Sequence, residues 1–324
     1  MNPFYQEIFE QPTALRQCIE FYEHNRTLLA SLPRPAQPVF LGMGASYHAA
    51  WAMSDYAHSL NIPALALEAA DTLNYSTSLL RSNSSLTFVS QSGKSAEVAP
   101  IIDLLPEDTV LIGITNDSES LLAQRAQVVL PIMAGVETTV ATKTYINTLA
   151  LLWLMMRQWA GLPQDMNTLK TIADQIDEVL KNADTITARW LERLSQARSI
   201  VFLGHGPHAA TARQAAMMVN EWAKLPASSF SIGAFRHGFI ESSSLDLGVV
   251  IFSPPAAKTH ASALALADEL RAYGARVYVE CRAGYVFTAP LLDIIPAQLF
   301  AEVFARHRGI EPGFRFISKV ITRL

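Results

Sequence analysis

A run of small, hydroxyl-bearing residues from Ser90 to Ser95 has the composition of an anion-binding loop. It reads Ser-Gln-Ser-Gly-Lys-Ser and follows an apolar stretch, typical of a buried strand, that ends at Val89. Beyond it, apolar residues recur at helical spacing over 96–105. A loop between a strand and a helix presents several backbone N–H groups, and the helix dipole also favours an anion. We therefore expect a phosphate here, with hydrogen bonds from the serines and a positive charge from Lys94; the alternative is a plain capped turn.

Further side chains in the second half of the chain could act on a small substrate. Glu221 lies late in a predicted helix, and His237 follows sixteen residues later in a glycine-flanked loop. A carboxylate and an imidazole can serve as a general acid and base, although spacing alone favours an ordinary surface glutamate and loop histidine. Arg315 and Lys319 lie in a terminal segment too apolar for a solvated tail, which we expect to be docked. Lys319 is then either surface charge or a group that acts on a carbonyl substrate.

A repeat predicts the elements that position these groups. The sequence over 39–44, Val-Phe-Leu-Gly-Met-Gly, reappears over 201–206 as Val-Phe-Leu-Gly-His-Gly, and an alanine-rich helical pattern follows each copy. Further strands are predicted at similar distances beyond each copy, over 86–89 and 109–114 in the first and over 249–252 and 276–279 in the second. This α/β alternation predicts two doubly wound, flavodoxin-like domains in tandem, each with a parallel sheet that binds ligands beyond the carboxyl ends of its strands.

The two copies differ at the loop. Where the first has its serines, the second has Ser253-Pro254-Pro255. Proline has no N–H group, so it cannot contribute to an anion nest. We therefore expect one phosphate site in each chain, in the first half.

The length of 324 residues agrees with two domains. The boundaries we expect are a helical N-terminal segment over 1–35, a first domain over 36–163, a helical connector over 164–197, a second domain over 198–305, and an active-site tail over 306–324.

Composition excludes several classes of protein. The net charge of −4 gives no electrostatic reason to expect nucleic acid as a partner. Cys18 and Cys281 are far apart and favour two buried free thiols over a disulfide or a zinc site. The start of the chain lacks the apolar core of a signal peptide, and the apolar run over 149–156 is too short to span a bilayer. We expect a buried helix there, in a cytoplasmic protein without membrane contact.

Taken together, these motifs resemble those of the tandem sugar isomerase (SIS) domain family. The family includes the isomerase half of glucosamine-6-phosphate synthase, phosphosugar deaminases and fructosamine-6-phosphate deglycases. The resemblance covers roughly 38–322. It implies a substrate and phosphate site formed by Gly44, Ser46, Ser90, Gln91, Ser92, Ser95, Val140, Ala141, Thr142 and Arg315. Val140 to Thr142 are included because residues 137–142 resemble the family's Glu-x-x-Val-Ala-Ser segment, which begins here at Glu137.

The resemblance also implies roles for the catalytic groups. Glu221 corresponds to the family's proton-transfer glutamate, His237 to its ring-opening histidine, and Lys319 to its active-site lysine. It implies a homodimer in which His237 reaches the neighbouring subunit's site, and a reaction on a small sugar phosphate that needs no metal or other cofactor. Proton transfer between C1 and C2 of the open-chain sugar would run through an enediol or enaminol, and a positioned base contributes about 10²–10⁴-fold to such a step.

Departures from the family pattern narrow the range of substrates that we expect. Met218 stands where the synthase has a lysine, and Ala234 and Phe239 replace a glutamate and a proline of the histidine motif. The chain begins Met-Asn-Pro-Phe, so we expect no glutamine-hydrolysing domain. We expect an enzyme that breaks the C–N bond of an amino-sugar or fructosamine 6-phosphate. The alternatives are a plain aldose–ketose phosphosugar isomerase and a non-catalytic phosphosugar sensor.

Overall fold

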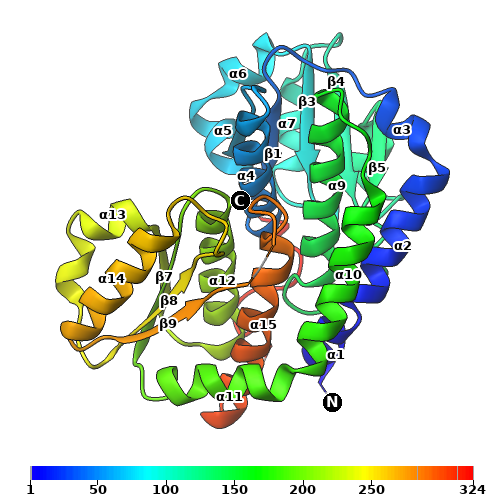
Figure 1. Cartoon of the computed structure of the whole chain (residues 1–324). Helices are drawn as coiled ribbons and strands as arrows, with labels where there is room; N and C mark the ends of the chain where they lie inside the picture. Colours follow the sequence, from blue (N-terminus) through cyan, green and yellow to red (C-terminus); the bar gives the residue numbers. More distant parts are fainter. Residues whose placement is uncertain (1, 283, 312, 324) are drawn as a thin grey trace. The chain divides into compact units, whose positions relative to one another are not determined.

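The computed structural model describes residues 2–282, 284–311 and 313–323, which form two compact units (Figure 1). We call Glu10–Ala173 together with Arg315–Leu324 the five-stranded unit, and Met1–Phe9 together with Asp174–Phe314 the four-stranded unit.

The sheet of the five-stranded unit is parallel throughout. Its strands are β1 (Val39–Gly42), β2 (Leu65–Glu68), β3 (Ser85–Val89), β4 (Val110–Thr115) and β5 (Val128–Pro131), in the order β2-β1-β3-β4-β5. The order changes direction between β1 and β3, and ligands bind beyond the strand ends at such a point in a doubly wound sheet. The loops that follow β1 and β3 are the two in which the sequence predicts a substrate site.

Helices cover both faces of this sheet (Figure 1). On one face, α4 (Ala45–Ser59) packs against α9 (Lys143–Trp159), with α2 (Gln11–His24) and α3 (Arg26–Ala30) against α9. On the other face, apolar side chains of β1, β3 and β4 pack against a second set of helices. This set consists of α5 (Ala69–Tyr75), α6 (Thr77–Ser82), α7 (Val98–Leu104) and α8 (Leu121–Arg125). Because both faces are covered, the strands are apolar runs rather than alternating ones.

The four-stranded unit repeats this plan. Its strands β6 (Ser199–Gly204), β7 (Ala227–Ser231), β8 (Leu247–Phe252) and β9 (Arg276–Glu280) are parallel and ordered β7-β6-β8-β9. Apolar side chains of α13 (Ile232–Arg236) and α14 (His260–Ala272) pack in one core with β6, β8 and β9. α12 (Pro207–Ala223) packs on β6 and β7 and against α15 (Pro290–His307), which also contacts α1 (Pro3–Phe9) and α11 (Ala183–Leu194). α10 (Met166–Lys181) precedes α11, and the 3₁₀ turn η1 (Phe239–Ser242) follows α13.

The repeated Gly-x-Gly turns have the same conformation in both units. Gly44, before α4, has φ 51° and ψ −125°, and Gly206, before α12, has φ 54° and ψ −129°. A residue with a Cβ rarely adopts this conformation. The first glycine of each pair is required by space, since a Cβ on Gly204 would lie 2.3 Å from the carbonyl oxygen of His208. The predicted tandem of doubly wound sheets is confirmed.

Two smaller expectations have different outcomes. The apolar run over 149–156 lies in α9 and is buried as expected. Cys18 is a buried free thiol, but Cys281 is exposed, because it immediately follows β9 at the end of the sheet. In the part of the chain that the structure describes, no helix is long and apolar enough to cross a membrane.

Candidate active site

The serine-rich loop after β3 is held in shape by its own hydroxyl groups. The amide of Gly93 donates to the Ser90 hydroxyl oxygen over 3.1 Å, and the Ser90 and Ser95 hydroxyls lie 3.3 Å apart. The amide of Lys94 donates to the Ser92 hydroxyl oxygen over 3.2 Å. The serines are thus prearranged around the centre of the loop. α7 begins at Val98, two residues later than the helical pattern predicts.

The end of β4 fixes the loop from the other side. The Thr115 hydroxyl and the Asn116 amide both donate to the carbonyl oxygen of Gln91, over 3.2 Å and 2.9 Å. Gly93 has φ +59°, and a Cβ on it would lie 2.1 Å from the Ser120 hydroxyl oxygen. Only glycine fits this backbone and this space. The loop is therefore rigidly attached to the neighbouring strand.

Lys94 is engaged within the protein. Its ammonium group donates to the Asp117 carboxylate over 2.6 Å. Hydrogen bonds from the Lys94 side chain and the Glu119 amide lower the pKa of Asp117 below its usual value. The positive charge that the sequence assigns to a ligand is therefore paired with Asp117.

Two other predicted segments belong to the same unit. Gly44 and Ser46 form the turn and the first helical turn after β1, next to β3 in the sheet. Val140 and Thr142 are buried and Ala141 is half-buried, just before α9. The fold thus brings the turn after β1 and the loop after β3 to one edge of the sheet, as predicted.

A buried carboxylate shapes the segment before α9. Glu137 Oε1 accepts hydrogen bonds from the amide and hydroxyl of Thr142, over 2.8 Å and 3.0 Å, and from the Thr144 amide over 3.1 Å. Glu137 Oε2 accepts from the Thr144 hydroxyl over 2.6 Å. These contacts fold residues 137–144 into a compact turn around the carboxylate.

The C-terminal segment contributes an amine to this turn. Lys319 Nζ donates to Glu137 Oε2 over 2.8 Å, and the Glu137 side chain is fully buried. Burial alone raises the pKa of Glu137, but the Lys319 charge and the hydrogen bonds from Lys319, Thr144 and Thr142 outweigh it and lower the pKa below its usual value. The segment is docked at Lys319, as expected, whereas Arg315 is exposed.

Glu137 is not among the site residues that the sequence predicts, where it stands only as the first residue of a motif. The available signal was a glutamate followed by threonines at 138, 139, 142 and 144, which can satisfy a buried carboxylate.

Glu221 lies in the last turn of α12, in the four-stranded unit. Around it, the end of α12 is fixed by buried contacts with other helices. Trp222 Nε1 donates to the Glu302 carboxylate of α15 over 2.8 Å, and the Trp222 ring packs on Phe4 of α1 with 4.3 Å between centroids. Lys224 ends the helix in the left-handed conformation, and its ammonium group donates to the carbonyl oxygen of Glu221. The position of Glu221 is therefore set by well-packed neighbours.

His237 lies in the same unit, just after α13, and is exposed. The Ser231 hydroxyl oxygen caps the start of α13 by accepting from the Ala234 amide over 3.1 Å. Arg236 pairs with Glu269 of α14 over 2.8 Å. The next residue, Gly238, has φ +127°, and Phe239 is 52% exposed with its ring 4.0 Å from that of Phe230. The imidazole thus lies on an exposed, glycine-flanked turn, as the sequence indicates.

The three departures from the family pattern lie in different surroundings. Met218 is fully buried on α12, whereas Ala234 and Phe239 are exposed on the histidine turn.

Among the described residues, no cluster of three or more histidine, cysteine, aspartate or glutamate side chains could hold a metal ion.

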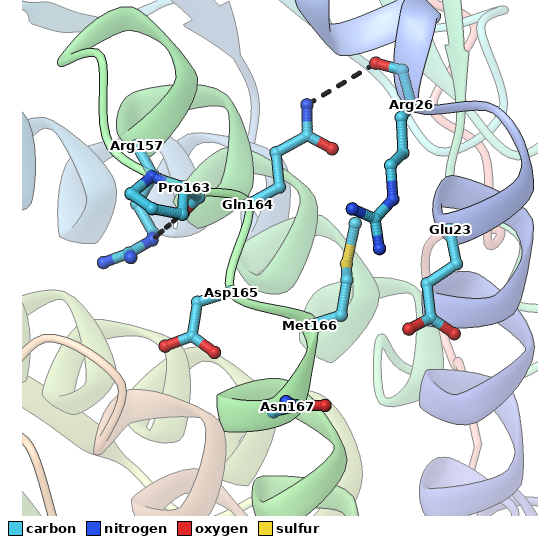
Figure 2. A pocket seen from close by; sticks show the side chains of 8 residues that line it. All are labelled: Glu23, Arg26, Arg157, Pro163, Gln164, Asp165, Met166 and Asn167. Carbon is cyan, nitrogen blue, oxygen red and sulfur yellow. Dashed lines mark hydrogen bonds between the residues drawn. The ribbon is translucent and has the colours of Figure 1, made fainter.

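A separate hollow of about 340 Å³ lies in the five-stranded unit, at the start of α10 (Figure 2). It is lined by Glu23, Arg26, Arg157, Pro163, Gln164, Asp165, Met166 and Asn167. Its carboxylates are engaged, Glu23 by Lys170 over 2.6 Å and Asp165 by the amide and hydroxyl of Thr168. Arg157 Nε donates to the carbonyl oxygen of Pro163 over 2.8 Å. None of the predicted site residues lines this hollow.

Comparison with known proteins shows the family and the fold of this chain. The family model for the SIS domain matches residues 35–157 and 193–283, one match in each repeat. The chain belongs to the SIS domain family. The SIS matches contain both Gly-x-Gly turns, the Ser90–Ser95 loop, Glu221 and His237.

Among curated proteins, the SIS chain is similar to glutamine–fructose-6-phosphate aminotransferase (isomerizing) of Methanothermobacter thermautotrophicus. The two are 26% identical over 327 residues, which cover 94% of this chain and 55% of the relative. The enzyme of the same name from Streptococcus pyogenes serotype M1 is 27% identical, with 99% and 58% covered. The chain therefore spans about half the length of these curated relatives.

Solved structures show the same fold. The C-terminal domain of glucosamine-fructose-6-phosphate aminotransferase from Francisella tularensis superposes with a TM-score of 0.85 at 20% identity, covering 97% of this chain and 98% of that one. A glucosamine-6-phosphate deaminase from Thermotoga maritima gives 0.85 at 21% identity, with 99% of both chains covered. The tagatose-6-phosphate ketose/aldose isomerase of Escherichia coli gives 0.83 at 20% identity, with 98% and 96% covered.

Proposed function

We propose that this SIS protein is an enzyme that acts on an amino-sugar or fructosamine 6-phosphate and moves a proton between C1 and C2. The observation that carries the proposal is the course of the C-terminal segment within the five-stranded unit. Lys319 is held by Glu137, and two residues later the carbonyl oxygen of Ile321 accepts from the amide of Ala96 over 3.0 Å. Ala96 directly follows Ser95, so an amine and a phosphate loop are joined through one short segment.

Each group then has a defined role. The Ser90–Ser95 loop binds the phosphate, and this remote binding energy orients the reacting carbons. His237 moves the proton that opens the sugar ring, and Glu221 carries a proton between C1 and C2 of the open chain. Lys319 stabilises the negative charge that develops on the carbonyl oxygen. In a substrate with a nitrogen substituent, protonation of the enaminol carbon gives an imine, and addition of water to the C=N carbon then releases the amine and leaves a carbonyl. An unmodified sugar would isomerise.

We favour cleavage of the C–N bond over plain isomerisation. The apolar Met218 on α12 replaces a lysine of the synthase pattern, and Ala234 removes a carboxylate from the histidine motif. The loss of these two charged residues of the synthase pattern suits a substrate different from that of the synthase.

The direct test is incubation with glucosamine 6-phosphate and with fructoselysine 6-phosphate, while ammonia or lysine release is measured. Release from either substrate is expected. Isomerisation of fructose 6-phosphate or tagatose 6-phosphate without amine release would remove the C–N cleavage proposal but keep the enzyme. Tight binding of these sugars without any turnover would instead support a sensor.

We also propose a homodimer in which His237 serves the neighbouring subunit's site. The exposed imidazole on its glycine-flanked turn and the adjacent exposed Phe239 support this arrangement. We propose cytoplasmic metabolism as its setting, because the sugar phosphates that it would use are intracellular metabolites.

A further inference from the structure

We propose that Glu137 is a positioning residue that keeps Lys319 as a fixed ammonium, so that this amine acts on the substrate through charge and hydrogen bonds and forms no imine with it. The inference rests on the proposed function, in which Lys319 faces a sugar carbonyl. Lysine in such a site has two alternative roles, as a cation or as a nucleophile. The surroundings of Glu137 distinguish between them.

The Glu137 carboxylate is held in place by its neighbours. Glu137 is fully buried and accepts hydrogen bonds on both oxygens from Thr142 and Thr144. The residue before it is also held, because the carbonyl oxygen of Val136 accepts from Lys143 Nζ over 2.6 Å. Lys143 in turn pairs with Glu10 of the segment before α2 over 2.6 Å. The carboxylate therefore cannot move to solvent to find another partner.

The Lys319 ammonium balances the negative charge of Glu137. The threonines supply neutral donors, so the Lys319 ammonium is the cation that compensates the Glu137 charge in the part of the chain described. The side chain of Lys319 is 21% exposed. One face of the ammonium group thus meets the carboxylate, while its other N–H groups remain available to a ligand.

Imine formation would disturb this balance of charge. The ammonium must first lose a proton, the neutral nitrogen then adds to the carbonyl carbon, and the carbonyl oxygen leaves as water. Loss of that proton would leave a buried carboxylate without its cation, which is strongly unfavourable. A protonated Lys319 that donates hydrogen bonds to the developing oxyanion avoids this state throughout the reaction.

Trace acetylation with acetic anhydride measures the nucleophilicity of each lysine without any substrate. We expect Lys319 to react at least about tenfold more slowly than the exposed Lys258, as a paired ammonium should. In the Glu137→Gln variant the reactivity of Lys319 should rise several-fold, while Lys170, which pairs with Glu23 outside the 137–144 turn, stays unchanged as an internal control. Acetylation of wild-type Lys319 at the rate of Lys258 would overturn the proposal.

Turnover provides an independent readout. Arginine keeps the charge but cannot form an imine, so Lys319→Arg should retain far more activity than Lys319→Met. Borohydride added during turnover should leave no reduced sugar adduct on Lys319, and such an adduct by mass spectrometry would refute the fixed ammonium. If Glu137→Gln does not fold, acetylation of the wild type and the activities of the two Lys319 variants still distinguish a fixed ammonium from an amine that forms an imine. If no sugar phosphate is turned over, the proposed function fails, while acetylation still tests the pairing.

Discussion

The backbone amide of Ala96 donates a hydrogen bond to the carbonyl oxygen of Ile321 over 3.0 Å. This contact joins the C-terminal segment to the residue that follows the Ser90–Ser95 loop. With Lys319 on Glu137, it fixes the segment at two points within the five-stranded unit.

Removal of residues 319–324 should abolish turnover, because both the amine and the Ile321 contact are lost. We expect kcat to fall by about 10²-fold or more, the size of a lost transition-state contact. The matched control removes only residues 323–324 and keeps both contacts. Steady-state kinetics give the kcat of each truncated protein. Full activity after removal of residues 319–324 would contradict a role of this segment in turnover.

Gly93→Ala should destabilise the protein and weaken phosphate binding. The left-handed backbone at +59° and the 2.1 Å approach to the Ser120 hydroxyl leave no room for a methyl group. We expect a loss of roughly 2 kcal/mol or more in the free energy of unfolding, the range for strain with a steric clash. Gly284→Ala is the control, since nothing lies within 4 Å of its Cβ position. Equal urea midpoints for the two variants would show that the loop tolerates rearrangement.

Glu221→Gln should abolish catalysis while leaving substrate binding largely intact. The amide keeps the shape of the side chain but cannot carry a proton, so kcat should fall by about 10²–10⁴-fold. Glu192→Gln, on the exposed surface of α11, should behave like the wild type. Calorimetric titration with the sugar phosphate separates affinity from turnover. Unchanged kcat in Glu221→Gln would assign the proton transfer to another group.

Mixing two inactive variants tests whether His237 acts across a dimer interface. A heterodimer of Glu221→Gln and His237→Ala subunits would contain one site with both native residues. A one-to-one mixture that exchanges subunits should therefore recover about a quarter of wild-type activity, from half heterodimers with one working site in two. Activity of the mixture that stays at the level of the separate variants would place His237 in its own subunit's site.

The fold was largely predictable because its signals are local. Each Gly-x-Gly turn follows an apolar strand and precedes a helix. The turns at Gly44 and Gly206 therefore indicate that one strand–turn–helix motif occurs twice in the chain. The edge strands carry a weaker signal. β7 is Ala-Ser-Ser-Phe-Ser and half exposed, and the apolar pattern of a buried strand is absent from it. Its place beside β6 is visible only once the sheet forms.

The site was predictable where its groups are close in sequence. The serines of the loop contact one another within six residues, and the structure keeps them together. Lys94 was assigned to the ligand by its charge, whereas its partner Asp117 comes from the next strand end, 23 residues away. Glu137 and Lys319 are 182 residues apart, so composition and spacing could not pair them. Contacts of this kind depend on the topology.

The pH dependence of stability should contain a contribution from Glu280, at the end of β9. Its carboxylate accepts from Trp190 Nε1 over 3.1 Å and lies 2.9 Å from Arg282 Nε. Burial is the main cause that raises the pKa of Glu280 to about 7 from 4.5, and the Asp293 carboxylate adds to it, while Arg282 opposes the rise. Between these two values the folded state holds a proton that the unfolded state has released.

Stability due to this group is therefore fully present below pH 4.5 and is lost as pH rises toward 7, at up to about 1.4 kcal/mol per pH unit. Glu280→Gln should remove that slope, because the amide does not titrate and still accepts from Trp190. Urea unfolding of both proteins at pH 5, 6, 7 and 8 gives the difference directly. The free energy of unfolding of the variant should rise relative to that of the wild type between pH 5 and pH 7. The difference should change little between pH 7 and pH 8. Parallel curves for the two proteins would mean that Glu280 stays ionised in the folded unit, with Arg282 as the dominant influence on its carboxylate.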